Sequence, residues 1–394
     1  MKQKVGLAVV TYMNNFGSYL QSYATSEVIK NLGYETEVIS IDGVQKEIDM
    51  ARRKYFMRRA FNLSELRSYL VSIQGVARFK LDGTYARQIA ERNAMYEVFR
   101  KENFKFSKIG YGWDEISKIC LDYSSVVVGS DQLWRPANIE GGYYTLEFVP
   151  DKVNKVAYST SFGVASLPKS QAEKAKQFLP RINHLSVREE KGKALIKSLT
   201  GIDVPVVCDP TMLFTREEWD AHVGERMIKD DYVLCYFLGD NGICIVFAFL
   251  FLQKVLKTWM NVKLVGLVHG AGYNRHVSLY IDEVPFNTGP FEFINLIKYA
   301  KCVLTDSFHC CVFSILFERE FFAFRRFKDT DIMSTNDRLT TLFKWTNIEG
   351  RLLSGTEEAN EKLFKDIDYN VVKRNLDAKR RESMEYLIKA LKNE

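Results

Sequence analysis

Hydrophobic and polar positions alternate in blocks that predict strands followed by helices. Near the N-terminus, an apolar run at residues 5–10 predicts a strand, and a polar loop follows at residues 11–17. Residues 18–32 have amphipathic spacing that predicts a helix, and residues 35–41 form a second strand-like run. The sequence therefore predicts a βαβ unit at the start of the chain.

The same pattern continues along most of the chain. Further strands are predicted at residues 125–128, 155–158, 185–187, 204–208, 232–237, 263–268, 302–305 and 321–324, and a helix at 243–259. Most of these strand-like runs are continuously apolar, which is typical of parallel sheets covered on both faces. A charged segment without strand pattern, residues 215–229, divides the series. We therefore predict an α/β fold with two Rossmann-like domains at residues 1–225 and 226–370, and a helical tail at 371–394.

Polar side chains recur directly after the predicted strands. Asn15 and Gly17 lie in the loop after the first strand, Asp131 and Gln132 follow residues 125–128, and Arg188 follows residues 185–187. Open α/β sheets bind their ligands at the carboxyl ends of the strands, so these side chains are candidates for a binding crevice. The alternative interpretation is that they are ordinary turn and cap residues.

The segment 301–324 predicts a strand, a turn, a helix and a second strand. Asp306 or Ser307 is placed to cap the helix, and His309 lies in its first turn. A helix N-terminus presents free N–H groups and a positive field to an anion, and this field favours a neutral imidazole that can relay a proton. The alternative interpretation is that Ser307 only caps the helix and that His309 is a half-buried structural histidine.

Composition limits the class of protein. The chain has 394 residues, of which 46% are hydrophobic and 26% charged, which suits two globular domains and excludes a disordered protein. The longest apolar run, residues 243–252, is too short for a membrane-spanning helix of about 20 residues, and no signal-peptide pattern is present, so we expect a cytoplasmic protein. Seven cysteines without a C-x-x-C pair predict reduced core thiols.

Charge narrows the choice of partners. The net charge of +6 favours anionic ligands, and no sequence signature of nucleic-acid binding is present. Residues 45–105 are basic and aromatic, and a solvated helical face is the simpler interpretation of them. The alternative is peripheral docking on an anionic membrane surface. The basic side chains concerned are Arg52, Arg53, Lys54, Arg58 and Arg59.

Several sequence blocks, taken together in their order, resemble the polysaccharide pyruvyl transferase family. They are NNFGSYLQSYA at 14–24, VVVGSDQLW at 126–134, YSTSFG at 158–163, LSVREEKG at 185–192, CDPTMLF at 208–214, TDSFHCCVFSILF at 305–317 and NDRLTTLF at 336–343. The resemblance implies a GT-B-like pair of domains whose parallel sheets face a cleft. It also implies transfer of a pyruvyl group from phosphoenolpyruvate onto sugar hydroxyls as a ketal.

The resemblance also implies roles for individual residues. His309 would be the acid/base, Ser307, Arg188, Arg326 and Arg338 would hold the donor, and Asn15, Gly17, Asp131 and Gln132 would line the acceptor side. Many family members have Arg-x-His where this chain has Ser307, Phe308 and His309, so other residues must hold the anion here. The donor would bind to the C-terminal domain and a glycan or lipid-linked sugar to the N-terminal domain, without a metal or a separate cofactor.

Two further functions remain open from the sequence. A nucleotide-sugar glycosyltransferase of GT-B type would share this architecture, and Asp329, Thr330 and Asp331 spell the D-x-D pattern with which other glycosyltransferases hold a metal. Such a short match in a charged loop also arises by chance. A non-catalytic binding subunit of a glycan assembly system is the other alternative.

Overall fold

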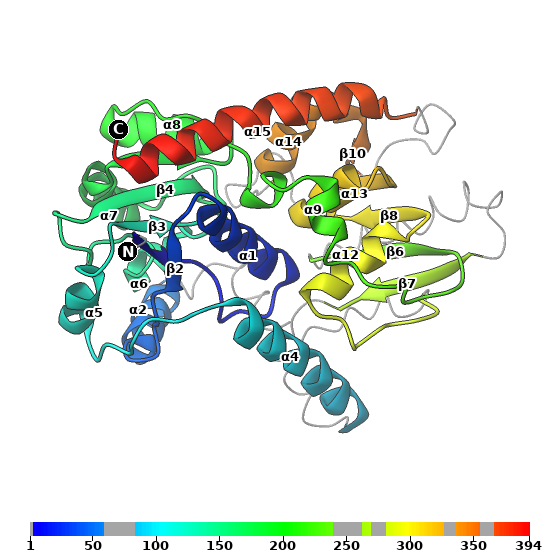
Figure 1. Ribbon diagram of the computed structural model, residues 1–394, viewed down its shortest axis with the longest axis horizontal. Coiled ribbons are helices and arrows are strands. Elements are labelled where there is room, and N and C mark those ends of the chain that lie inside the picture. The colour runs from blue at the N-terminus through cyan, green and yellow to red at the C-terminus, as the bar shows by residue number, and fades with distance from the viewer. Residues whose placement is uncertain (1–2, 59–82, 239–261, 269–280, 327–335, 355–365) are drawn as a thin grey trace.

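The first domain is built on a parallel five-stranded sheet. The computed structural model describes residues 3–58, 83–238, 262–268, 281–326, 336–354 and 366–394 (Figure 1). The first sheet has the order β2-β1-β3-β4-β5, and neighbouring strands pair in parallel. Its strands are β1 Lys4–Ala8, β2 Glu35–Val38, β3 Ser125–Val128, β4 Asn154–Thr160 and β5 His184–Val187.

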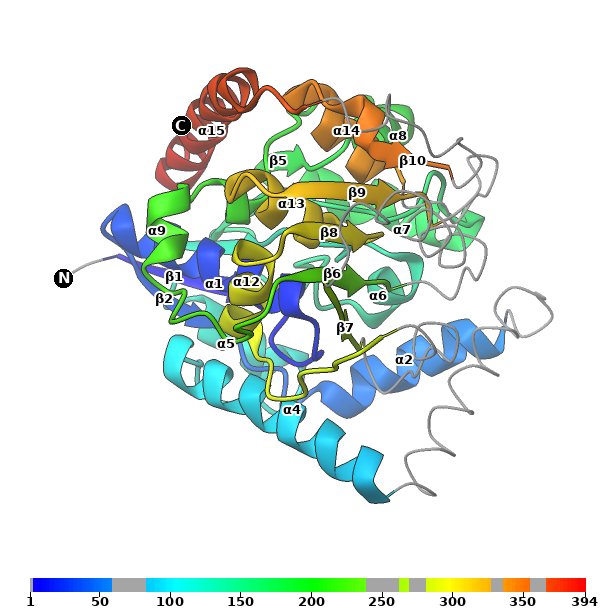
Figure 2. The ribbon, with the colours of Figure 1, turned by 90° about the vertical axis from the view of Figure 1, so that its right-hand side faces the viewer.

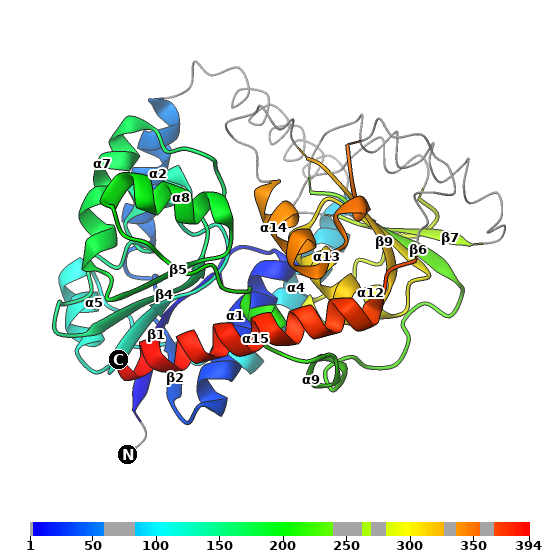
Figure 3. The ribbon, with the colours of Figure 1, turned by 90° about the horizontal axis from the view of Figure 1, so that it is seen from above.

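The second domain repeats the arrangement with another parallel five-stranded sheet, in the order β10-β9-β8-β6-β7. Its strands are β6 Tyr232–Tyr236, β7 Lys263–Leu267, β8 Cys302–Thr305, β9 Glu320–Phe324 and β10 Leu352–Leu353. Figure 2 looks onto this domain, and Figure 3 shows the two domains side by side. The α/β fold with two Rossmann-like domains is therefore confirmed.

Helices surround both sheets. In the first domain they are α1 Phe16–Asn31, α2 Gln45–Met57, α4 Gly83–Asn103, α5 Trp113–Cys120, α6 Pro136–Gly141, α7 Lys169–Phe178 and α8 Glu190–Thr200. From the connecting segment onward they are α9 Arg216–Asp220, α12 Pro290–Lys298, α13 Phe308–Leu316, α14 Asp337–Thr346 and α15 Tyr369–Lys392. The predicted helix at 243–259 and the D-x-D pattern at 329–331 lie outside the described residues.

Helix α1 joins the two domains. It packs against α12 and α13, and the ring of Phe16 stacks on Phe293 with centroids 4.8 Å apart. Several of its buried polar side chains bond to nearby backbone: Ser22 Oγ, for example, donates to the carbonyl of Val10, just after β1, at 2.9 Å. One hydrophobic cluster therefore continues from the first sheet through α1 into the second domain, while a second cluster covers the other face of the first sheet.

Helix α15 returns from the second domain to the first (Figures 1 and 3). Its N-terminal Tyr369 donates its hydroxyl to the carbonyl of Arg319 at 2.8 Å, in the second domain. Near its other end, Asn154 of β4 donates to the carbonyl of Ala390 at 2.8 Å. Helix α15 thus contacts both domains, and the predicted division of the chain at residues 225 and 370 stays a prediction.

One predicted strand is wrong. Residues 204–208 form no named strand, and only an isolated parallel bridge joins Val206 to Val187 of β5. Pro205 has no N–H to donate to a ladder, and Asp209 with Pro210 then starts a 3-10 turn in which Thr211 N donates to the Asp209 carboxylate. This turn, rather than a strand end, fixes the direction of the Asp209 side chain.

Candidate active site

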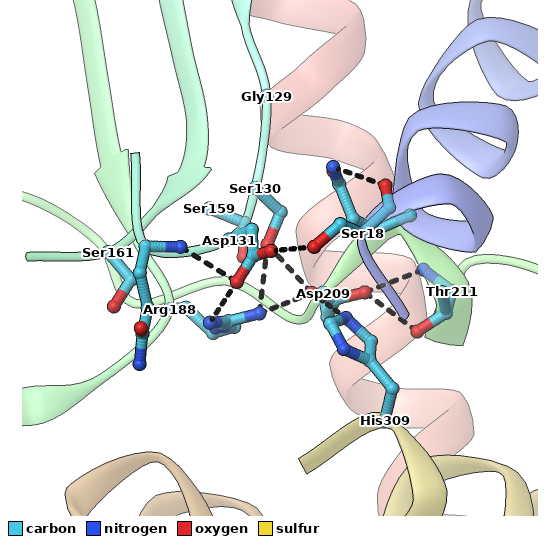
Figure 4. Close-up of polar contacts among 12 residues, drawn as sticks. Ser18, Gly129, Ser130, Asp131, Ser159, Ser161, Arg188, Asp209, Thr211 and His309 are labelled. Atoms are coloured by element: carbon cyan, nitrogen blue, oxygen red, sulfur yellow. Dashed lines mark hydrogen bonds and ion pairs between the residues drawn. The ribbon is translucent and has the colours of Figure 1, made fainter. Parts of the chain in front are cut away.

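The ends of the first sheet meet the N-terminus of α13 at a group of buried and partly buried polar side chains (Figure 4). Loops after β3 and β5, the 3-10 turn and the start of α1 supply the first-domain members, and α13 supplies the histidine. These members are Ser18, Ser130, Asp131, Arg188, Asp209 and His309. The site thus combines residues of both domains at the carboxyl edge of the first sheet, where open α/β sheets bind ligands.

Asp209 is the centre of the group and is fully buried. Its Oδ2 accepts hydrogen bonds from Ser130 Oγ and from Arg188 Nη1, both at 2.7 Å. Its Oδ1 accepts from the backbone N–H and the hydroxyl of Thr211. Burial by itself would raise the pKa of Asp209, but His309 and Arg188 hold that pKa far below its ordinary value. Asp209 is therefore a carboxylate.

His309 lies beside this carboxylate. The residue is only 6% exposed. Its Nε2 is 3.3 Å from Asp209 Oδ2, and the two atoms are not aligned for a hydrogen bond. The other ring nitrogen faces Gly17 of α1, because a Cβ atom on Gly17 would lie 2.1 Å from Nδ1. As predicted, His309 is in the first turn of α13, and Ser307 caps this helix by accepting from the Cys310 N–H. The site therefore pairs an imidazole with a carboxylate.

Asp131 is the second carboxylate of the site. Its backbone has a φ of +83°, and its side chain accepts hydrogen bonds from Ser18 Oγ at 2.5 Å and from the Gln132 N–H at 2.8 Å. Arg188 Nη2 lies 3.6 Å from Asp131 Oδ1. Burial would raise the pKa of Asp131, but Arg188 and His309 lower it overall. One guanidinium therefore lies between two carboxylates.

Arg188 and Arg338 both approach the ring of Phe308. Their guanidinium carbons are 4.5 Å and 5.9 Å from the ring centroid. When the Gln132 side-chain amide is oriented with its oxygen toward Arg338, this oxygen accepts hydrogen bonds from Nη2 and Nη1 of Arg338 at 2.8 Å and 3.2 Å. Burial, followed by repulsion from Arg188 and Arg326, lowers the pKa of Arg338. This crowding of positive charge is an arrangement that an anionic ligand would stabilise.

Arg326 is bonded to Asp306, two residues before α13 begins. Its Nε donates to Asp306 Oδ2 at 2.9 Å, and its Nη2 donates to the Asp306 carbonyl at 3.0 Å. Asp306 Oδ1 also accepts from the Leu238 N–H at 2.7 Å. These bonds fix the Arg326 guanidinium at Asp306, the residue before Ser307. If Arg326 binds the donor, it does so next to the start of α13.

Most of the predicted site residues therefore come together. Gly17, Asp131, Gln132, Arg188, His309 and Arg338 contact this group or one another, Ser307 caps the helix that carries His309, and Arg326 bonds to the adjacent Asp306. Asn15 is different, because its Oδ1 caps α1 by accepting from the Ser18 N–H at 3.1 Å. Asn15 thereby positions Ser18 against Asp131. The assigned donor and acceptor roles stay predictions.

Sequence analysis assigned no site role to Asp209, Ser130, Ser18 and Glu189, although Asp209 directly follows a run predicted as a strand. Glu189 accepts from Ser161 Oγ at 2.7 Å, and burial raises its pKa. Asp209 stands in the CDPTMLF block, which was the available signal, but its partners Ser130 and His309 are remote in the sequence. Within the described residues, no three His, Cys, Asp or Glu side chains are grouped as metal ligands.

Comparison with known proteins identifies the family. The model of the polysaccharide pyruvyl transferase family matches residues 15–326, which is most of the chain and includes every residue of the central group. The chain belongs to the polysaccharide pyruvyl transferase family. The predicted resemblance is thereby confirmed. No protein with a curated description matches the sequence significantly.

Solved structures show the same architecture at low sequence identity. UDP-N-acetylglucosamine 2-epimerase from Rickettsia bellii is 8% identical, with 100% of this chain and 98% of that chain covered and a TM-score of 0.51. Another UDP-N-acetylglucosamine 2-epimerase is 10% identical, with coverages of 99% and 96% and a TM-score of 0.51. These similarities concern the fold alone, which is the GT-B-like pair of Rossmann-like domains.

Proposed function

We propose that this member of the family transfers a pyruvyl group from phosphoenolpyruvate onto sugar hydroxyls of a polysaccharide or its lipid-linked precursor, forming a ketal. The observation that carries the proposal is the pairing of His309 with the Asp209 carboxylate, 3.3 Å apart, next to buried arginines. Membership of the family supports the pyruvyl transfer, and the charges around His309 support an anionic donor. The product would enter polysaccharide biosynthesis.

The donor carries a phosphate and a carboxylate, so its site needs several cationic or N–H groups. Arg338 and the free N–H groups at the start of α13 are the first candidates, and Arg326 adjoins the same helix end. Arg188 is neutralised by Asp209 and Asp131, and we assign it mainly to holding these two carboxylates. No metal is needed to balance the donor charge in this scheme.

The proposed reaction balances without another reactant. Protonated His309 gives its proton to the methylene carbon of phosphoenolpyruvate, and one acceptor hydroxyl forms a C–O bond at the neighbouring carbon. A second hydroxyl of the same sugar then displaces phosphate and closes the ketal. Of the two hydroxyl protons, one returns to His309 and the other leaves with phosphate. Asp209 stabilises the imidazolium and keeps the ring in place, as a carboxylate beside a catalytic histidine does.

A nucleotide-sugar glycosyltransferase remains the alternative function. The observation in its favour is that the fold resembles that of UDP-N-acetylglucosamine 2-epimerases, whose names refer to a UDP-sugar. The two functions differ in the donor that they bind. A non-catalytic binding subunit is the third alternative. It does not explain why the chain buries His309 beside the Asp209 carboxylate, although burying charged groups costs free energy.

We also infer peripheral contact with an anionic membrane, through α2. The outer side of this helix exposes Met50, Phe56 and Met57, whose exposed fractions are 64%, 49% and 68%, and the exposed cations Arg53 and Lys54 lie among them. Apolar side chains beside cations are the combination that binds the surface of an anionic bilayer. Such contact would bring the enzyme to a lipid-linked acceptor. Among the described residues, no helix is long and apolar enough to cross a bilayer.

A thermal-shift comparison of phosphoenolpyruvate with UDP-N-acetylglucosamine tests the function. A donor that binds only the folded protein stabilises it by about 2.7 kcal/mol at a concentration 100 times its Kd. We expect phosphoenolpyruvate to raise the Tm and the nucleotide sugar to leave it unchanged. The opposite result would replace pyruvyl transfer by the glycosyltransferase alternative.

A further inference from the structure

A cavity of about 390 Å³ lies in the first domain, apart from the residues around His309. It is bounded by segments that follow β1 and β2 and by the helices α2 and α6, and it therefore lies at the carboxyl edge of the first sheet. Its volume is in the range of small-molecule sites, which is roughly 300–1,000 Å³. Nothing in the site described above accounts for it.

Three tyrosine side chains line the cavity, and hydrogen bonds hold the hydroxyls of two of them. They are Tyr12, Tyr143 and Tyr144. The Tyr12 hydroxyl accepts from the Ile41 N–H at 3.2 Å, and the Tyr143 hydroxyl donates to the Ile39 carbonyl at 2.7 Å. Trp134 Nε1 donates to the Tyr144 carbonyl at 3.0 Å. A ligand would meet a rigid aromatic surface, which lowers the entropic cost of binding.

Polar side chains of α2 form the opposite wall. Gln45, Asp49 and Arg52 are spaced by four and then three residues, so one face of the helix presents all of them to the cavity. Within the described part of the chain, none of these three side chains makes a hydrogen bond to protein or an ion pair. They are therefore available to a ligand.

This combination of walls selects the chemistry of the ligand. An acyl chain would leave Gln45, Asp49 and Arg52 without partners, which is unfavourable when they are covered. A nucleoside diphosphate would meet one cation and one anion, and the Asp49 carboxylate would repel it. A saccharide satisfies both walls, because its C–H face stacks on tyrosine rings and its hydroxyls bond to amide, carboxylate and guanidinium groups.

The cavity and the group around His309 share two loops. Tyr12 and Met13 line the cavity, and the same connection leads into Gly17, which contacts His309. Asn138 of α6 lines the cavity and donates to the carbonyl of Gln132, in the loop after β3, at 3.2 Å. A chain of sugar units that reaches His309 can therefore be held by this neighbouring cavity.

We propose that the cavity between α2 and α6 binds an uncharged saccharide unit of the acceptor, next to the unit that receives the pyruvyl group. The acceptor assignment rests on the proposed function. The cavity would select acceptors of at least two sugar units, and Arg52 and Gln45 would contribute affinity without taking part in the reaction.

Binding to a glycan array tests this site with the full-length protein. The array carries mono- to tetrasaccharides ending in glucose, galactose, mannose or N-acetylhexosamines. We expect wild-type protein to bind a subset of the oligosaccharides, and Arg52→Ala and Gln45→Ala to weaken that binding roughly tenfold, as loss of a ligand hydrogen bond does. Lys46→Ala is the matched control, since Lys46 is another cation of α2, is exposed to solvent and does not line the cavity. It should bind like the wild type.

Two results would overturn the proposal: wild-type affinity in both cavity variants, or no saccharide bound by the wild type. Stabilisation by phosphoenolpyruvate is measured on the same proteins. Saccharide binding that depends on Arg52 without any response to phosphoenolpyruvate would contradict the proposed function and keep the saccharide site. If phosphoenolpyruvate stabilises the protein but the variants bind saccharides like the wild type, the saccharide site is contradicted and the proposed function is kept.

Discussion

Gly17 and His309 are in direct contact although one belongs to the first domain and the other to the second. A Cβ atom at position 17 would lie 2.1 Å from His309 Nδ1 and 2.4 Å from its Cγ. The position therefore needs glycine because of a neighbouring side chain, and not because of its backbone angles. Any side chain there must displace the imidazole or α1 from the present arrangement.

Gly17→Ala should reduce activity while the fold remains. Displacing a catalytic group by about 1 Å costs on the order of 100-fold in rate, so we expect a loss of that size in kcat. Alanine normally stabilises a helix by about 1 kcal/mol relative to glycine, and a lower Tm would therefore report the clash. Gly224→Ala is the control, since a Cβ atom at position 224 would meet no other atom within 4 Å. A wild-type rate with a raised Tm for Gly17→Ala would contradict the contact.

Asp209→Asn should destabilise the protein strongly. Arg188 is buried and donates to Asp209 at 2.7 Å, and removing one partner of a buried ion pair costs about 3–5 kcal/mol. Urea denaturation measures this loss in the free energy of unfolding. Asp203→Asn is the matched control because Asp203 is 3.4 Å from Lys193 on the surface, where an ion pair contributes roughly 0–1 kcal/mol. Equal losses in the two variants would show that Arg188 does not depend on Asp209.

The depressed pKa of Asp209 also predicts a pH dependence of stability. Its pKa in the folded protein lies below the unfolded value of about 3.9, so its stabilising effect is complete above that value and is lost as the pH falls below it. The wild type should therefore keep its stability advantage over Asp209→Asn from about pH 6 to about pH 4, and should lose it progressively as the pH is lowered from about 4 to about 2. Denaturant unfolding of both proteins across this range measures it. A constant difference between the two curves would contradict the assignment of Asp209 as a carboxylate.

Arg338→Gln should weaken donor binding. Arg338 is buried beside Arg188, and this repulsion is relieved when an anion binds, so its loss should raise the KM for phosphoenolpyruvate by roughly 10- to 100-fold. Lys344→Gln changes an exposed cation on the same helix, α14, and should leave KM unchanged. If Arg338→Gln and Lys344→Gln behave alike, Arg338 does not contact the donor.

Vesicle co-sedimentation tests the outer side of α2. The wild type should bind vesicles rich in phosphatidylglycerol and should bind phosphatidylcholine vesicles weakly, because the exposed face combines apolar and cationic side chains. Replacing Met50, Phe56 and Met57 by serine should abolish binding. Tyr111→Ser, which changes a residue 73% exposed elsewhere, serves as the control. Equal binding by the triple variant would exclude α2 as the contact.

Local pattern was sufficient for much of the fold and insufficient for the geometry of the site. Residues 125–128 and 302–305 form strands with the predicted bounds because each is buried on both faces, and Ser307 caps α13 because that bond is local. Residues 204–208 were wrongly predicted as a strand because Pro205 cannot donate a backbone hydrogen bond and so prevents regular pairing with β5. The partners of Asp209 come from loops after the strands and from another domain, and no local pattern encodes such distant pairing.

The central claim is tested most directly by nuclear magnetic resonance of phosphoenolpyruvate labelled with carbon-13 at its methylene carbon. The labelled donor is incubated with the protein and with the oligosaccharides of the glycan array. The account predicts a new labelled methyl signal attached to a ketal carbon, with release of phosphate, in the wild type and not in His309→Ala. Equal formation of the ketal by both proteins would remove His309 from the reaction, and no ketal together with binding of a UDP-sugar would contradict pyruvyl transfer itself.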